Sequence, residues 1–319
     1  MNDLDHLFDS IRSDFNNEFE NFFFPQDPKK LYDPIRYVVK GKGKRLRPIL
    51  VHIIGRALRS EPKSIMAASI AVELLHNFTL IHDDIMDDDT IRHGRKTVHK
   101  NWNQSTAILA GDALFSYSQI AMIKFSKNVK IYKIFNETII EICEGQALDI
   151  NFENNNSINQ DQYLDMIEKK SGALLGFCSR VIPEDLCLEK RTCYAMDNFG
   201  RNLGKGFQIQ DDILEIFSDT KNMGKSLGSD IVFGKQTILS ILAREKNPKK
   251  WSDFLKIYLS EKDNLDQIRN FLNETGVKKT AENLAESFFQ ESLLCLEELK
   301  NIDKGEIEYF IDFIKFRGK

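Results

Sequence analysis

The sequence has few of the residues that interrupt regular structure. Seven prolines and 17 glycines are spread over 319 residues, too few for the regularly spaced turns of a β-sandwich or β-barrel. Hydrophobic residues make up 42% of the chain and charged residues 29%, a balance that supports a substantial core and excludes global disorder. The composition therefore predicts a mostly helical globular protein.

The sequence also lacks a large excess of charge of either sign, and its cysteines do not occur in pairs. The 48 acidic and 44 basic side chains leave a net charge of −4, which provides no field to draw the protein onto a polyanion, so no nucleic acid is expected as a partner. The cysteines are odd in number and form no CxxC pair, which indicates neither a disulfide framework nor a zinc site. They are Cys143, Cys178, Cys187, Cys193 and Cys295.

Long hydrophobic runs are absent as well. The first residues, MNDLDHLFDSIRSDF, are acidic and amphipathic and lack the basic flank and apolar centre of a signal peptide. Nowhere do about 18 apolar residues run together. We therefore expect a cytoplasmic protein with no integral membrane segment.

Apolar residues recur at helical spacing over most of the chain, and no strand pattern competes. The absence of linkers, fixed-period repeats and composition breaks predicts a single domain over residues 1–319. The glycine-bearing segment from Ser218 to Lys235 is predicted to be a functional loop. The expected helices are 3–22, 29–40, 45–58, 62–88, 104–124, 129–151, 160–181, 188–216, 232–245, 250–259, 263–273, 278–299 and 304–316.

The first chemical signal is the acidic cluster in HNFTLIHDDIMDDD. Asp83 and Asp87 are spaced i and i+4, so they share one helix face, and Asp84 flanks them. Like charges at this spacing repel unless a cation neutralises them. The alternative is an exposed acidic helix end, but interleaved Ile85 and Met86 argue against a plain solvated run. Oxygen ligands on one face suit Mg²⁺, which is commonly shared with substrate phosphates.

A second cluster repeats the pattern in GFQIQDDILEIF. Asp211 and Glu215 are again i and i+4, with Asp212 beside Asp211. Two such clusters on apolar-flanked helices, more than a hundred residues apart, suggest two halves of one metal site.

Basic groups accompany both clusters, as phosphate ligands require. Arginine offers a planar fork and lysine a point charge to phosphate oxygens, although each of these residues taken alone is as well explained as solvated surface. The pattern predicts metal-bridged diphosphate binding. The candidates are Lys44, Arg45, Arg47, Arg92, His93, Arg95, Lys169, Lys170, Lys225 and Lys235.

Several polar residues carry a weaker signal. His76 is either a ligand contact or a satisfied core histidine. Gln146, Asp149 and Gln208 are either members of a buried polar network or residues of a helix surface.

These segments together resemble the trans-isoprenyl diphosphate synthases of the polyprenyl synthetase family, and the likeness covers nearly the full chain. The segments that carry it follow the order of the family. They are GKGKRLRP, ELLHNFTLIHDDIMD, RHGRKTVH, AGDALF, GQALD, KKSGALL, FQIQDDILE, GKSLGSD and GKQT.

The resemblance implies an all-α bundle around a deep central cavity, a homodimer, and two acidic helices that face each other. It implies that Asp83, Asp87 and Asp211 ligate Mg²⁺, aided by Asp84, Asp212 and Glu215. It also implies that Lys44, Arg47 and His76 hold isopentenyl diphosphate. The implied contacts of the allylic diphosphate are Arg92, His93, Lys170, Ser171, Gln208, Lys225 and Lys235. Of these, Lys170 and Lys225 join the aspartates as catalytic residues, and Arg317 is implied to cap the homoallylic diphosphate.

The sequence departs from the family pattern at four positions. His93 replaces the second arginine of a pair, Glu215 replaces an aspartate, Ser171 replaces a threonine, and Lys96 replaces a proline. None of these changes removes a main metal ligand. His93 provides a neutral or partly protonated phosphate contact near pH 7.

The implied reaction joins isopentenyl diphosphate to dimethylallyl, geranyl or farnesyl diphosphate by ionisation, condensation and elimination. Phe78 and Thr79 lie one turn before Asp83 and are implied to limit the length of the product. An aromatic residue at Phe78 favours a short product. The small Thr79, and the absence from the first motif of the two-residue insertion common in bacterial farnesyl synthases, favour twenty carbons first and fifteen second. The alternatives are a terpene cyclase, which needs no isopentenyl diphosphate pocket, and a non-catalytic partner subunit, which usually loses its acidic motifs.

Overall fold

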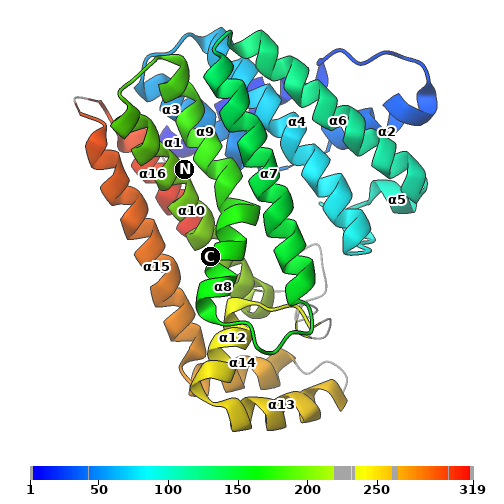
Figure 1. The fold of residues 1–319 in the computed structure, drawn as a ribbon, viewed down its shortest axis with the longest axis vertical. Helices are drawn as coiled ribbons and strands as arrows, with labels where there is room; N and C mark the ends of the chain where they lie inside the picture. Colours follow the sequence, from blue (N-terminus) through cyan, green and yellow to red (C-terminus); the bar gives the residue numbers. More distant parts are fainter. Residues whose placement is uncertain are drawn as a thin grey trace. The chain divides into compact units, whose positions relative to one another are not determined.

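The computed structural model describes residues 3–41, 43–218, 231, 234–260, 265–300 and 302–316, and in these residues helices dominate. Figure 1 shows the helices in chain order, from α1 to α16. This arrangement confirms the predicted all-α class. The longer helices before residue 160 are α1 (Asp3–Glu20), α2 (Lys29–Val39), α3 (Leu46–Ala57), α4 (Pro62–Met86), α6 (Gln104–Phe125) and α7 (Val129–Phe152).

The later helices correspond to the remaining predicted ranges, with one division. The segment predicted as a single helix over 160–181 consists of α8 (Gln160–Ile167), the π-helical turn η1 (Glu168–Gly172) and α9 (Ala173–Asp185). The others are α10 (Lys190–Phe217), α12 (Ile238–Lys246), α13 (Pro248–Ser260), α14 (Leu265–Glu274), α15 (Val277–Cys295), the 3₁₀ turn η2 (Leu296–Glu298) and α16 (Gly305–Lys315).

One expectation about local structure was wrong, because a short hairpin follows α4. Strands β1 (Ile91–Arg92) and β2 (Arg95–Lys96) pair antiparallel, and the short helix α5 (Val98–Asn101) follows them. His93 and Gly94 connect the strands with φ of 50° and 74°. Two consecutive residues with positive φ are typical of a two-residue hairpin turn that matches the strand twist. Strands of two residues are too short to show alternation in the sequence.

The chain divides into two compact units. The first comprises Met1–Ile134, Cys178–Cys193 and Asn301–Tyr309, and the second comprises Phe135–Phe177, Tyr194–Lys300 and Phe310–Lys319. The single domain over residues 1–319 remains a prediction. The first acidic cluster lies in the first unit and the second cluster in the second unit, and each is described below by itself.

The core of the first unit forms where α4 packs against α3 and α6 (Figure 1). Residues of α3 such as Ile49 and Leu50, and of α4 such as Leu74, are fully buried. Gly111 of α6 permits the close approach of α4, since a Cβ at this position would lie 2.3 Å from His82 Nε2. This packing holds the last turns of α4, which carry the first acidic cluster, against α6.

Glycines also set the packing of the second unit. A Cβ on Gly200 of α10 would lie 2.1 Å from the carbonyl oxygen of Leu175, and one on Gly204 would lie 2.5 Å from Gly172 Cα. On α7, a Cβ on Gly145 would lie 2.4 Å from the backbone nitrogen of Lys170. Because such distances forbid a side chain, α7 and α10 approach the π turn at backbone contact.

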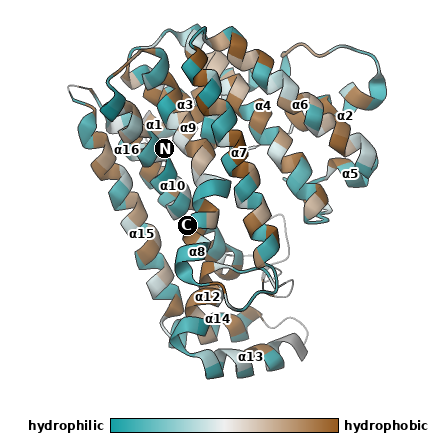
Figure 2. Cartoon of the chain, viewed as in Figure 1, coloured by the Kyte–Doolittle hydropathy of each residue, from teal (hydrophilic) through white to brown (hydrophobic). Residues whose placement is uncertain are grey.

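Two helices among the described residues, α4 and α6, are long and apolar enough to cross a membrane by length and composition alone. In α4, 56% of the apolar window is buried inside the protein, against 39% in α6. Core helices of soluble proteins pass the same test, so neither helix is a clear membrane span. The low burial of α6 leaves part of an apolar helix exposed, and Figure 2 colours the hydrophobic residues along this helix brown.

His52 on α3 makes the stability of the first unit sensitive to acid. Its Nε2 atom is buried without a hydrogen-bond partner. Burial lowers the pKa of His52 from 6.5 to about 4, with Asp14 opposing the shift and Arg56 adding to it. The folded protein therefore binds this proton less tightly than the unfolded chain does, so the contribution to stability is complete above pH 6.5 and falls as the pH drops toward 4.

We predict that His52→Leu reduces the loss of unfolding free energy between pH 7.5 and pH 5 by about 2 kcal/mol. Urea unfolding followed by circular dichroism at both pH values measures the loss. His6→Gln, at an exposed position of α1, is the control and should leave the loss unchanged. An equal loss in wild type and His52→Leu would contradict the assignment.

Candidate active site

The last turn of α4 carries the first acidic cluster. Asp87 caps the helix, and its backbone nitrogen donates to the carbonyl oxygen of Asp83 at 2.8 Å. Asp83 and Asp87 are half-buried on the same face, as their spacing predicts. Asp84 differs, because it is only 4% exposed. The three neighbouring aspartates therefore occupy two different environments.

Arg92 neutralises the buried Asp84. Arg92 Nε donates to Asp84 Oδ1 at 2.5 Å, and Nη2 donates to Asp89 Oδ2 at 3.3 Å. Arg92 lies on β1, and Asp88, with a φ of 51°, lies between the end of α4 and this strand. A predicted phosphate contact thus lies directly beside the carboxylates predicted to bind metal.

The structure also brings Arg47 and His76 together. Arg47 Nη1 lies 3.0 Å from His76 Nε2. Burial lowers the pKa of His76 well below its usual range, and the positive charge of Arg47 lowers it further. Because a neutral His76 accepts at Nε2 from the guanidinium, it carries its proton on Nδ1.

His93 lies in the same electropositive surroundings. Partial desolvation lowers the pKa of His93, and Arg92, Arg45 and Lys44 lower it further while Glu73 opposes them. His93 is therefore neutral near pH 7. The basic residues of GKGKRLRP and of the hairpin form one positively charged region in the first unit.

Two of the candidate cations serve the fold instead. Arg45 is 6% exposed, pairs with Glu73 at 2.5 Å and lies over the ring of Phe19. Arg95 stacks on Tyr37, with the guanidinium carbon 3.7 Å from the ring centroid, and donates to the carbonyl oxygen of Tyr37. These contacts hold Arg45 and Arg95 to protein groups of the first unit.

Phe78 belongs to an aromatic group one turn before Asp83. Its ring centroid lies 4.8 Å from that of His82 and 5.5 Å from that of Phe115 on α6. Thr79 is half-buried beside it, and its hydroxyl donates to the carbonyl oxygen of His76. These rings pack α4 against α6 in the turn of α4 that comes just before Asp83.

The second acidic cluster shows the same division of roles. Asp211 and Glu215 are half-buried on one face of α10, whereas Asp212 is only 7% exposed. Asp212 accepts hydrogen bonds from the Tyr163 hydroxyl at 2.6 Å, the backbone nitrogen of Ile238 at 3.0 Å and Gln208 Nε2 at 3.1 Å. Asp212 therefore anchors α8 and the start of α12 to α10.

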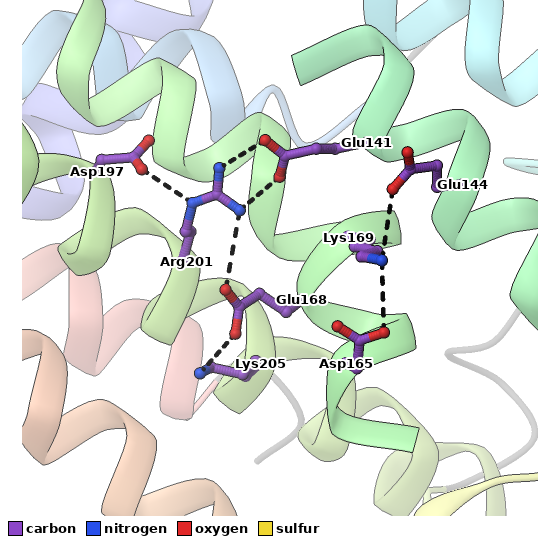
Figure 3. Close-up of polar contacts among 8 residues, drawn as sticks. All are labelled: Glu141, Glu144, Asp165, Glu168, Lys169, Asp197, Arg201 and Lys205. Atoms are coloured by element: carbon purple, nitrogen blue, oxygen red, sulfur yellow. Dashed lines mark hydrogen bonds and ion pairs between the residues drawn. The ribbon is translucent and has the colours of Figure 1, made fainter. Parts of the chain in front are cut away.

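The π turn η1 presents Lys170 and Ser171 beside this cluster. Lys170 Nζ lies 2.5 Å from Asp149 Oδ2 on α7, and the Ser171 hydroxyl donates to Gln208 Oε1 at 2.9 Å. Because Gln208 also donates to Asp212, Ser171 and Asp212 are connected through one amide. Lys169 points elsewhere and pairs with Glu144 and Asp165 (Figure 3).

Lys235 is half-buried after Gly234, and its carbonyl oxygen accepts from the backbone nitrogen of Thr237 at 3.2 Å. Gly234 has a φ of 73° and is held by Asn154, whose backbone nitrogen donates to the Gly234 carbonyl. The other basic residues predicted in this region and at the end of the chain, Lys225 and Arg317, lie outside the described residues.

Comparison with known protein families identifies the family to which the chain belongs. Residues 28–275 match the family model described as polyprenyl synthetase. The chain belongs to the polyprenyl synthetase family. This membership confirms the resemblance that the ordered motifs indicated.

Relatives and solved structures agree with this assignment. The geranylgeranyl diphosphate synthase of Methanosarcina mazei is 38% identical over 291 residues, which cover 86% of this chain and 85% of that protein. The structure of geranylgeranyl pyrophosphate synthetase from Pyrococcus horikoshii Ot3 matches with a TM-score of 0.89 and 31% identity over 99% of this chain and 100% of that chain. A polyprenyl synthase from Caulobacter crescentus CB15, solved in complex with calcium and isoprenyl diphosphate, shares the fold with a TM-score of 0.88 and 23% identity over 99% and 97% of the two chains.

This polyprenyl synthetase is a short-chain prenyltransferase of isoprenoid biosynthesis. None of these relatives favours a terpene cyclase or a non-catalytic subunit. Polyprenyl synthetases are metal-dependent enzymes. In the described residues of this one, no three His, Cys, Asp or Glu side chains are grouped so as to hold a metal ion by themselves. Each acidic face instead offers two carboxylates, which fits a hard cation that completes its coordination with substrate oxygens and water.

Sequence reasoning left the role of one residue of this synthetase open. Gln146 on α7 is 7% exposed, and neither its Oε1 nor its Nε2 has a hydrogen-bond partner in the protein. Gln146 lies three residues before Asp149, so the two residues lie on one side of α7, and Asp149 pairs with Lys170. A buried amide without a protein partner is uncommon, and ordered water or a bound ion commonly satisfies such a group. Gln146 differs from a glutamine on the helix surface only in being buried, and burial cannot be read from the sequence.

Proposed function

We propose that this synthetase condenses isopentenyl diphosphate with an allylic diphosphate, either dimethylallyl, geranyl or farnesyl diphosphate, to make a twenty-carbon product. The aromatic group of Phe78, His82 and Phe115 carries this proposal, because it lies one turn before Asp83 between α4 and α6. A chain that grows from a diphosphate at the acidic face would meet these rings. The geranylgeranyl product named for the relatives from Methanosarcina mazei and Pyrococcus horikoshii supports the same length.

The allylic diphosphate is assigned to the acidic faces and their basic neighbours. Asp83, Asp87 and Asp211, with Glu215 at longer reach, would hold Mg²⁺, which supplies positive charge to the departing diphosphate. Arg92 and Lys170 bind diphosphate oxygens, together with His93, Lys225 and Lys235. In doing so Arg92 and Lys170 exchange their present carboxylate partners, Asp84 and Asp149, for substrate oxygens. Ser171 and Gln208 contact the same diphosphate.

Isopentenyl diphosphate is assigned to Lys44, Arg47 and His76. A neutral His76 accepts from Arg47 and donates from Nδ1, so it orients the guanidinium without adding charge. The allylic carbon–oxygen bond breaks and its electron pair leaves with the diphosphate. The double bond of isopentenyl diphosphate then attacks the allylic cation, and the released diphosphate takes the proton whose loss forms the new double bond. The apolar residues around Phe78 keep water from the cation.

We propose further that the synthetase acts as a homodimer through α6. The exposed face of this helix carries Ile108, Leu109, Ile120 and Ile123, which are between 41% and 58% exposed. Leu109, Ile120 and Ile123 recur at helical spacing with Asp112 and Ser116 between them. An apolar stripe of this kind is typical of an interface. Sedimentation should give a dimer, and Ile120→Asp combined with Ile123→Asp should give a monomer.

The proposed compartment is the cytoplasm. All five cysteines are free thiols, and Cys178 and Cys193 are buried. Free thiols in this number are typical of a reducing compartment.

The proposal is tested by incubating the protein with Mg²⁺, isopentenyl diphosphate and each allylic diphosphate in turn, and by sizing the dephosphorylated products. We expect incorporation of isopentenyl diphosphate and a twenty-carbon main product. A terpene cyclase would convert the allylic substrate alone, and a non-catalytic subunit would convert neither.

Phe78→Ala is predicted to lengthen the product by at least one five-carbon unit, because it removes the ring that packs on His82 and Phe115. Gas chromatography of the alcohols after phosphatase treatment measures the distribution. Phe8→Ala is the matched control, since it deletes the same ring at a buried site on α1 beside Tyr309. The same product profile in Phe78→Ala and wild type would remove Phe78 as the floor of the cavity.

A further inference from the structure

A dense ionic cluster in the second unit has no part in the function assigned so far. Figure 3 shows Arg201 of α10 at its centre, near Asp197 of the same helix and near carboxylates of α7 and η1. Arg201 grips Glu141 of α7 with two nitrogens, at 2.6 and 3.1 Å, and its Nε donates to Asp197 at 2.9 Å. Its Nη1 also lies 3.8 Å from Glu168 Oε1. Arginine in a bidentate pair combines charge with fixed geometry.

Glu168 is the first residue of η1, so it connects this cluster to the π turn. Arg201 approaches one oxygen of Glu168, and Lys205 Nζ lies 3.0 Å from the other. Arg201 and Lys205 lie one turn apart on α10. The N-terminal end of the π turn is therefore held to α10 by two cations.

The C-terminal end of the same turn also rests on Arg201. A Cβ on Gly172 would lie 3.1 Å from the carbonyl oxygen of Arg201 and 3.4 Å from its Cα. On Gly176, one turn later, a Cβ would lie 3.0 Å from Arg201 Cγ and 2.9 Å from Asp197 Oδ1. Both ends of η1 are thus in contact with the residue at the centre of the cluster.

Between these two ends lie Lys170 and Ser171. Their side chains contact Asp149 of α7 and Gln208 of α10. A π turn is rare, and it commonly occurs at functional sites. The residues Glu168 to Gly172 contain no proline that would account for this form. Contacts from α7 and α10 surround the turn.

We propose that Arg201 is a positioning residue, which acts through Glu168 to hold η1 in its π form and so fixes Lys170 Nζ and Ser171 Oγ for the allylic diphosphate. This inference rests on the proposed function for the ligand, but the link between Arg201 and the turn does not. Loss of the link lets η1 relax toward the α-helical form. Lys170 then moves from the allylic site, while the residues assigned to isopentenyl diphosphate lie in the first unit and keep their contacts.

The kinetic test compares Arg201→Met and Arg201→Lys with wild type in the presence of Mg²⁺. Arg201→Met keeps an unbranched side chain over Gly176 but removes both nitrogens of the bidentate pair. We expect about a tenfold rise in KM for the allylic diphosphate with KM for isopentenyl diphosphate unchanged, as for loss of a residue that orients a ligand contact. Arg201→Lys should recover part of the loss. Arg56→Met, which removes the exposed bidentate pair with Glu306 in the first unit, is the matched control.

A double-mutant comparison tests the route through Glu168. If Arg201 acts through this carboxylate, Arg201→Met combined with Glu168→Gln should raise the allylic KM no more than the stronger single variant. Additive effects would overturn the route. Equal rises in both KM values, matched by Arg56→Met, would show a merely structural role and overturn the proposal.

Hydrogen exchange provides a readout that does not depend on turnover. In Arg201→Met, amides of residues 169–173 should exchange about tenfold faster than in wild type, whereas Arg56→Met should leave them unchanged. Unchanged exchange in Arg201→Met would overturn the positioning role. A wild-type protein without prenyl transfer would sink the proposed function alone, and the exchange rates would still decide whether Arg201 holds the turn.

Discussion

Asp211→Ala is expected to lower kcat of prenyl transfer by about a thousandfold or more, with little change in stability. Asp211 is half-buried on the face of α10 that it shares with Glu215, and we assign it to the metal that stabilises the departing diphosphate. Loss of one preorganised group that stabilises developing charge commonly costs about a hundredfold to a thousandfold in rate, and loss of a metal ligand also displaces the ion. Glu215→Ala should cost only about tenfold, because its longer side chain acts from further away.

The neighbouring Asp212→Ala provides the contrast. Asp212 accepts from Tyr163, from the backbone nitrogen of Ile238 and from Gln208. Burial raises the pKa of Tyr163 well above its usual range, and Asp212 raises it further, so the hydroxyl remains a donor. Removing the shared acceptor leaves buried donors unsatisfied and should lower the free energy of unfolding by about 3 kcal/mol.

Incorporation of labelled isopentenyl diphosphate and thermal unfolding, measured on all three variants, separate these effects. Asp211→Ala should lose turnover and keep its melting temperature, while Asp212→Ala should lose both. Equal kinetic losses in Asp211→Ala and Glu215→Ala would show that the two carboxylates contribute equally to the second cluster.

In each acidic cluster, the sequence predicted which carboxylates share a helix face but not which of them is buried. Helical spacing alone predicted that Asp83 with Asp87, and Asp211 with Glu215, share a face, because periodicity is a local property. The burial of Asp84 depends on Arg92, which lies on β1, beyond the end of α4. The burial of Asp212 depends on Tyr163 and Ile238, which are distant in sequence. Contacts of this kind leave no periodic trace.

The basic residues show the same limit. The resemblance to the family assigned Arg47 and Arg92, but not Arg45 or Arg95, to the substrates. The sequence did not reveal what Arg45 and Arg95 contact instead, which is Glu73 and the ring of Tyr37. The π turn was likewise hidden, because residues 160–181 have an uninterrupted helical pattern and the glycines that press on the turn lie on α7 and α10.

Glu73→Leu is expected to destabilise the protein by about 4 kcal/mol, because it leaves the charge of Arg45 buried without its partner. The two side chains are 5% and 4% exposed and 2.5 Å apart. Arg45 has a positive φ of 52° at the start of α3, and it also donates to the carbonyl oxygens of Val39 and Gly41. The pair therefore ties the segment that carries Lys44 and Arg47 to α4, three residues before His76.

The matched control for this pair is Glu306→Leu, which removes the partner of Arg56. That pair has similar geometry, but Arg56 is 49% exposed, so the cost should stay below about 1 kcal/mol. Urea unfolding at pH 7.5 measures both variants.

The double variant Arg45→Met with Glu73→Leu replaces both charges by apolar groups and should recover most of the stability, since two matched apolar side chains avoid the desolvation of an unpaired ion. In the Glu73→Leu single variant, KM for isopentenyl diphosphate should rise because Arg45 no longer anchors the segment. A stability loss no greater than that of Glu306→Leu would show that Arg45 finds another counter-charge, and the pair would then have no special part in shaping the pocket of Arg47 and His76.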